Sequence, residues 1–121
     1  MLEKHIEQKL VQAVKKASGI APKLICPGFD GMPDRLVLLP NGKMAFVELK
    51  APGKKPRPLQ IKRHGVLRQL GFKVYVLDDL EQIGGILHEI ENSLLITMSE
   101  HSKIHAAQKE RDVYGRFIKS N

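Results

Sequence analysis

The chain has 121 residues, of which 42% are hydrophobic and 27% are charged, values typical of one globular domain with a core of its own. No apolar run approaches the length of about 18 residues that a membrane span needs, and the charged start is unlike a signal peptide. A single cysteine excludes an internal disulfide and fits a reducing compartment, so we expect the protein in the cytoplasm.

The formal charge of +7 is unevenly distributed along the chain. Residues 43–73 hold nine Lys and Arg against Glu48 alone, a local net charge of +8, whereas residues 74–100 hold six acids and no Lys or Arg. A solvated face explains any one of these cations. A cluster of one sign instead indicates a phosphate-binding surface, and the acidic stretch would confine a nucleic-acid partner to one side.

The first predicted element is an amphipathic helix over residues 2–18, ended by Gly19. Glu7 borders its buried face, so two interpretations of this carboxylate stay open. It either favours the positive end of the helix and pairs with Lys residues one turn away, or reaches a neighbouring site. The apolar positions at helical spacing are Ile6, Leu10, Ala13, Val14 and Ala17.

A short strand over Lys23–Cys26 and a turn over residues 29–33 lead to a predicted β-hairpin, in which Pro40-Asn41-Gly42 joins two apolar runs. We expect a three-residue loop, with proline opening a type I turn and glycine in the left-handed conformation. That register places Asp34 opposite Glu48 on one face of the hairpin. A two-residue Asn-Gly turn would shift the register by one and separate the two acids.

Two carboxylates that face each other repel, and such pairs commonly hold a cation. Oxygen ligands indicate Mg²⁺ or Mn²⁺ rather than zinc. Lys50 lies two residues beyond Glu48 on the same side of its strand, where it could orient or help deprotonate an attacking water. The alternative interpretation is an edge strand with surface charges, in which Lys50 only neutralises Glu48.

Residues 51–58 interleave prolines with cations, which predicts an extended loop that is either a linker or a phosphate contact at the mouth of the site. No aromatic residue is interleaved with these cations, so we expect backbone contact without base stacking. A helix over residues 59–70 follows, with His64 facing phosphate or solvent and Gln60 in its first turn. Its predicted apolar contacts are Leu59, Val66, Leu67 and Leu70.

The chain then predicts a buried strand over residues 72–77, reached by a βαβ crossover, and a helix that is capped by Asp78-Asp79, begins at Leu80 and runs to about Asn92. The inward positions of this helix are Leu80, Ile83, Leu87 and Ile90. A weaker helical pattern in residues 94–121 either completes the core or meets a second subunit.

Pro33-Asp34 followed by Glu48-Leu49-Lys50 resembles the PD-(D/E)XK nuclease signature, and Gly31-Met32-Pro33-Asp34 with Gln60 resembles its VRR-NUC branch. The similarity covers roughly residues 3 to 90. It implies an α/β fold with a restriction-endonuclease-like αβββαβ core, a central mixed sheet flanked by helices, over residues 1–93. The resemblance leaves residues 94–121 unmatched, and we expect them to form an additional C-terminal helical segment that either completes the core or joins subunits.

The resemblance also implies a metal-dependent endonuclease acting on DNA. Asp34, Glu48 and the Leu49 carbonyl would hold Mg²⁺ or Mn²⁺, Lys50 would position the water, and Glu7 and Gln60 would complete the catalytic group. The residues expected to contact the DNA backbone are Lys23, Lys54, Lys55, Arg57, Lys62 and Arg63.

VRR-NUC domains occur in phage and bacterial proteins, where repair and recombination intermediates are cut. We therefore expect structured or branched DNA as substrate, a homodimer that cuts both strands, and a bacterial or phage-infected cell as the setting. The alternatives are a non-catalytic DNA-binding module on the same fold and an RNA-directed nuclease.

Overall fold

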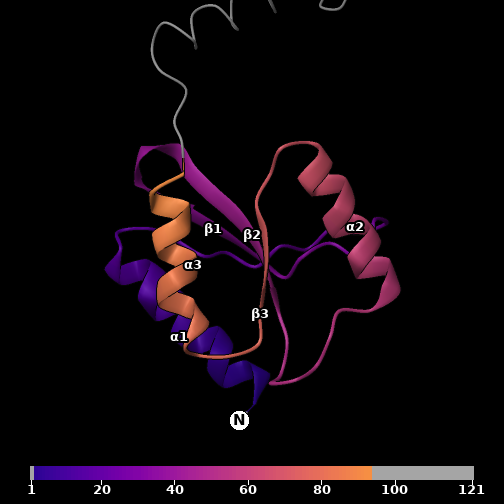
Figure 1. The fold of residues 1–121 in the computed structure, drawn as a ribbon, viewed down its shortest axis with the longest axis horizontal. Helices are drawn as coiled ribbons and strands as arrows, with labels where there is room; N and C mark the ends of the chain where they lie inside the picture. Colours follow the sequence, from indigo (N-terminus) through magenta and orange to yellow (C-terminus); the bar gives the residue numbers. More distant parts are fainter. Residues whose placement is uncertain (1, 94–121) are drawn as a thin grey trace, which may run out of the picture.

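The computed structural model describes residues 2–93, which form three layers with α1 and α3 on one side of a sheet and α2 on the other (Figure 1). Residues 94–121, including the predicted C-terminal helical segment, lie outside the described residues. The elements in chain order are α1 (Glu3–Lys16), β1 (Arg35–Leu39), a 3₁₀ turn (Pro40–Gly42), β2 (Lys43–Leu49), α2 (Pro58–Gln69), β3 (Val74–Leu77) and α3 (Gln82–Glu91).

The sheet has three strands in the order β1-β2-β3, with β2 antiparallel to β1 and parallel to β3. The predicted mixed sheet and the crossover from β2 through α2 to β3 are confirmed. Alternation along β2 turns Val47 and Leu49 toward the core beneath α1 and α3, whereas Phe46 packs with Leu67 of α2. Glu48 therefore points to the α2 side of the sheet.

The hairpin register is the predicted one. Leu39 pairs with Lys43 and Arg35 pairs with Val47, so one further step places Asp34 opposite Glu48. The turn type differs, because Asn41 adopts φ 68° as well as Gly42 at φ 72°. A type I turn needs a negative φ at the Asn41 position, and asparagine tolerates the left-handed region better than other side chains do.

The predicted strand over Lys23–Cys26 is wrong. The chain instead lies along the free edge of β1 from Ile20 to Leu24 and pairs with it only through isolated bridges, Ile20 with Leu38 and Lys23 with Arg35. The ladder is interrupted at Pro22, whose carbonyl accepts from the Leu36 N–H but which has no N–H to donate. The described sheet consequently has three strands instead of the four that an αβββαβ core implies.

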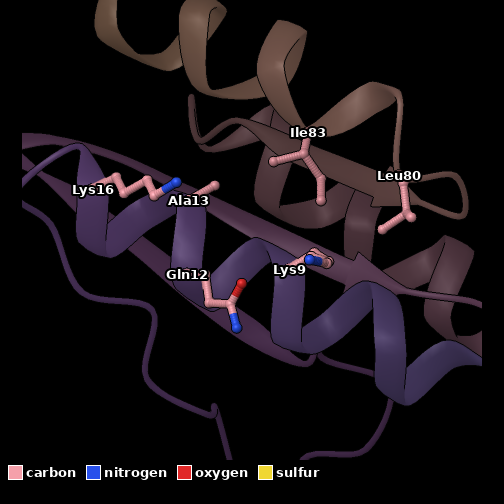
Figure 2. Close-up of a pocket in the computed structure, with 6 residues that line it drawn as sticks. All are labelled: Lys9, Gln12, Ala13, Lys16, Leu80 and Ile83. Atoms are coloured by element: carbon pink, nitrogen blue, oxygen red, sulfur yellow. The ribbon is translucent and has the colours of Figure 1, made fainter.

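Both predicted helices of the α1/α3 layer are present, α1 with Ile6, Leu10 and Val14 buried and α3 beginning two residues later than expected. Figure 2 shows a pocket of about 310 Å³ between them, in which Lys9 and Lys16 of α1 face Leu80 and Ile83 of the α3 side. This pocket is on the opposite side of the sheet from α2. Within residues 2–93, no helix is long and apolar enough to cross a membrane.

The packing of α2 reverses the predicted pattern. Leu67 is buried as expected, but Leu59, Val66 and Leu70 are exposed. Gln60 and His64 take the inward positions instead. The reason is that the inner face of α2 meets the polar end of β2 as well as the apolar cluster around Phe46, so apolar periodicity does not mark its buried face.

Candidate active site

A fully buried carboxylate lies at the end of the central strand. Glu48 is 0% exposed and is the penultimate residue of β2, beyond the apolar residues that surround Phe46 on the α2 side. Burying an ionised carboxylate is costly unless charges or hydrogen bonds compensate it. The groups that surround Glu48 therefore decide what this position can do.

Three side chains approach the two oxygens of Glu48. Gln60 Nε2 donates a hydrogen bond of 2.8 Å to Oε2, and Lys50 Nζ lies 3.3 Å from the same oxygen. His64 Nε2 lies 3.6 Å from Oε1, too far for a good hydrogen bond. Within the described residues, neither Glu48 Oε1 nor His64 Nε2 has a hydrogen-bond partner although both atoms are buried.

Gln60 is fixed from both ends of its amide. It stands at the third position of α2, and its Oε1 accepts a hydrogen bond of 2.8 Å from the backbone N–H of Arg57, which precedes the helix. This contact satisfies an otherwise free N–H at the helix start. Because Oε1 is occupied there, Nε2 is directed at Glu48.

Asp34 is placed by the turn that precedes β1 and by the buried Pro33. Its Oδ2 accepts a hydrogen bond of 2.7 Å from the backbone N–H of Leu49. The structure thus brings Asp34, Glu48, Leu49, Lys50 and Gln60 together at one end of the sheet, where β2 leads into the loop toward α2 (Figure 1).

The electrostatics of Glu48 reflect this crowding. Burial, and after it the negative charge of Asp34, raise the pKa of Glu48 from its ordinary 4.5 to about 7, although Lys50 partly opposes both. The same burial lowers the pKa of His64, assisted by the positive charges of Arg68 and Lys50. Glu48 therefore exchanges its proton near neutral pH, and burial favours the neutral form of His64 beside it.

His64 was expected to face phosphate or solvent, and that expectation is wrong because its side chain is only 2% exposed. A signal for this was present in the sequence. His64 follows Gln60 by four residues, and residues at that spacing share one face of a helix. Once Gln60 is assigned to the site, His64 should be assigned to it as well.

Glu7 does not pair with a lysine one turn away. Its Oε2 accepts hydrogen bonds from Arg35 Nε and Nη2 at 3.1 and 2.9 Å, and Arg35 also donates to the Ala21 carbonyl. Arg35 is the residue after Asp34, so α1 is tied to the same end of the sheet as the acid cluster. Within the described residues, no hydrogen bond or ion pair joins Glu7 to Asp34 or Glu48.

The cations predicted to contact DNA lie on the surface around this end of the sheet. Lys23 follows the edge of β1, Lys54 and Lys55 lie in the loop after β2, and Arg57 and Lys62 flank the start of α2. All five are exposed. Arg63 is half-buried, and its guanidinium lies over the ring of Phe29.

The donor set fits a hard divalent cation better than a soft one. Asp34, Glu48 and the Leu49 carbonyl supply oxygen only, and an unpartnered buried carboxylate oxygen with a raised pKa is the kind of atom that a cation stabilises. Within residues 2–93 no group of three or more His, Cys, Asp or Glu side chains could hold a metal. An ion bound here would complete its coordination with water, as Mg²⁺ usually does.

An α/β domain with an Asp, a Glu and a Lys clustered at one end of a central hairpin defines the architecture of the PD-(D/E)XK superfamily. A solved structure described as a VRR_NUC domain matches with a TM-score of 0.66 and 31% sequence identity, over 76% of this chain and 97% of that chain. The sequence is also 55% identical over 83 residues to "Putative nuclease p44" of Acyrthosiphon pisum secondary endosymbiont phage 1.

The match to the phage protein covers 67% of this chain and 89% of the relative. No protein-family model matches the sequence. The identity to the phage relative and the nearly complete coverage of the structural neighbour agree, and the chain belongs to the VRR-NUC family.

Proposed function

We propose that the chain is a metal-dependent endonuclease that hydrolyses phosphodiester bonds in DNA. The observation that supports this most is the buried Glu48, whose Oε1 has no partner in the described residues and which lies beside Asp34 and Lys50. A structural role alone does not account for a desolvated acid placed next to a second acid. A cation-binding site that acts on an anionic substrate accounts for both.

Asp34, Glu48 and the Leu49 carbonyl would hold Mg²⁺ or Mn²⁺. When bound, such an ion supplies positive charge to the phosphate and lowers the pKa of water. Gln60 fixes the plane of the Glu48 carboxylate through its hydrogen bond to Oε2. The Lys50 ammonium, beside that oxygen, orients the attacking water and stabilises charge that develops at the phosphate.

Glu7 is proposed to complete the catalytic group through its second oxygen. Both hydrogen bonds from Arg35 end on Oε2, so Oε1 is the atom available to accept from a water. Glu7→Gln should then slow cleavage while leaving the pairing with Arg35 partly intact. A variant that cleaves at the wild-type rate would restrict Glu7 to attaching α1 to β1.

The proposed substrate is structured or branched DNA, such as junctions or flaps in repair, recombination or phage DNA processing in a bacterial or phage-infected cell. The exposed cations around the acid cluster would hold the backbone; they are Lys23, Lys54, Lys55, Arg57 and Lys62. Two-fold symmetry would serve the cutting of both strands, and light scattering on the full chain would show whether it forms the proposed homodimer.

The test of the proposal is cleavage of plasmid and four-way-junction DNA by the purified full chain with Mg²⁺, Mn²⁺ or EDTA. Asp34→Ala, Glu48→Ala and Lys50→Ala should each abolish cleavage, and Glu91→Ala, which removes an exposed acid at the end of α3, should not. Cleavage that persists in Glu48→Ala would contradict the proposed role of Glu48 as a metal ligand. Salt-sensitive DNA binding without cleavage under any metal would instead favour a non-catalytic module, and matched RNA would reveal a preference for RNA.

A further inference from the structure

A second hollow lies beside the acid cluster, in the loop that leads to Asp34. It has a volume of about 310 Å³ and is formed within residues 24–32, with Ile25, Phe29 and Met32 among its lining residues. Ile25 is 76% exposed and Phe29 is 46% exposed. Exposed apolar side chains that line a hollow mark a surface for a ligand more often than isolated ones do.

The loop that forms the hollow packs against α2. Arg63 Nε donates a hydrogen bond of 2.7 Å to the Asp30 carbonyl, and the Arg63 guanidinium lies 3.9 Å from the centre of the Phe29 ring. Gly31 adopts φ 91°, and a Cβ there would come within 2.9 Å of side-chain atoms of Leu59 and Arg63. The loop therefore needs glycine at this position to lie this close to the helix.

The hollow is connected to the catalytic group both along the chain and through α2. Met32 is two residues before Asp34, and the Leu24 N–H donates to the Asp34 carbonyl at 2.8 Å. On the other side, Arg63 follows Gln60 by one helical turn, and Gln60 bonds Glu48. Phe29 thus lies against the helix whose first turn contacts Glu48, so a base seated on Phe29 and a phosphate held at Asp34 and Glu48 would come from one DNA.

Lys23 precedes the hollow and Arg63 lies over Phe29, with Lys62 next to Arg63 on α2, while Asp30 in the lining carries one negative charge. An exposed aromatic ring beside three cations complements a nucleotide, whose base has flat apolar faces and whose phosphates are anionic. We propose that the hollow takes one unstacked nucleobase of the DNA substrate, which stacks on the free side of Phe29. This inference rests on the proposed function and narrows its substrate to DNA with an unpaired base beside the cleaved bond.

A base inside an intact duplex is covered by its neighbours and cannot reach such a wall without being extruded. Unpaired bases at a junction, flap or mismatch are already free, so the hollow would favour them over paired DNA. The expectation of backbone contact without stacking rests on the lack of aromatic residues among the cations of residues 51–58 and on the lack of tryptophan in the chain. The aromatic residue lies in a different loop, which folding brings to the same site.

The experiment compares Phe29→Ala with Phe72→Ala. Phe72 is 43% exposed and lines a hollow with Lys43 at the other end of the sheet, so it is a matched control. Binding is measured in EDTA by fluorescence anisotropy with two DNAs of equal length, one fully paired and one with a short unpaired stretch. Phe29→Ala should weaken binding of the second DNA by roughly 5- to 100-fold, the size of base–aromatic stacking, and leave the first unchanged.

Phe29→Tyr should retain wild-type binding and Phe29→Leu should not, which separates stacking from a loss of fold or of apolar area. A 2-aminopurine placed in the unpaired stretch should be quenched by the wild type and less by Phe29→Leu. Equal effects of Phe29→Ala on both DNAs, or none on either, would overturn the inference. These readouts do not need cleavage, so a wild type that cuts neither DNA would count against the proposed function and not against the hollow.

Discussion

His64 Nε2 lies 3.6 Å from Glu48 Oε1, and each is a buried polar atom without another partner in residues 2–93. A neutral imidazole can donate one N–H, so a small movement would let His64 hydrogen-bond the carboxylate once Glu48 is ionised. His64 would then be a positioning residue for Glu48.

We predict that His64→Leu weakens Mn²⁺ binding and slows cleavage by roughly 10- to 100-fold, the usual effect of removing a group that orients a metal ligand. His64→Gln, whose amide can also donate, should recover most of this loss. Isothermal titration with Mn²⁺ and single-turnover cleavage would measure both variants. Wild-type metal affinity in His64→Leu would show that the histidine only fills space.

The raised pKa of Glu48 predicts how stability depends on pH without metal. Between the ordinary value of 4.5 and about 7, the folded protein keeps a proton that the unfolded chain has lost. Stability therefore falls as pH rises through this window, by roughly 1 to 3 kcal/mol for this group. Urea unfolding in EDTA at several pH values should show the fall in the wild type and its absence in Glu48→Gln.

A comparison at one pH gives the matching test. At pH 8, Glu48→Gln should be more stable than the wild type in EDTA, because it removes a desolvated charge. If Glu48→Gln proves less stable at pH 8, the contacts of the carboxylate outweigh its burial, and the proposed cause of the raised pKa would be wrong.

Divalent metal should counteract the loss of stability that accompanies rising pH. A cation and a proton compete for Glu48, so the rise in unfolding temperature on adding Mn²⁺ should be larger at pH 8 than at pH 6. Differential scanning fluorimetry at both pH values would measure it, with Asp34→Ala as the variant expected to show little rise at either. A rise that is independent of pH would place the ion away from Glu48.

Gln60 hydrogen-bonds both the start of α2 and Glu48, so replacing it should lower the free energy of unfolding more than replacing a surface glutamine does. Gln60→Ala would free the Arg57 N–H and remove the donor to Glu48 Oε2, so we expect a loss of roughly 1 to 3 kcal/mol of unfolding free energy. Gln69→Ala, an exposed glutamine at the other end of α2, should cost less than about 0.5 kcal/mol. Equal losses in urea unfolding would contradict the double role.

The sequence predicted the hairpin register, and with it the meeting of Asp34 and Glu48, because the alternating strands and the Pro40-Asn41-Gly42 loop are local signals. It did not predict the burial of His64, because a buried polar side chain on a helix depends on a partner from another element. The strand over Lys23–Cys26 was wrongly predicted because composition indicates an extended chain but does not show which edge pairing forms. Pro22 has no N–H to donate, and only isolated bridges to β1 are present.

The inverted packing of α2 has a mechanical consequence. Among the buried residues of α2, which lies wholly within the described part of the chain, Leu67 is the one apolar side chain, while Gln60 and His64 face the carboxyl group of Glu48. Hydrophobic anchoring therefore holds α2 more weakly than α1, which buries Ile6, Leu10 and Val14. Amide hydrogens of α2 should therefore exchange faster than those of α1 in EDTA. Their exchange should slow markedly with Mn²⁺, because an ion bound at Glu48 would hold the helix against the sheet. Binding of the metal would then both complete the catalytic group and stabilise α2 locally.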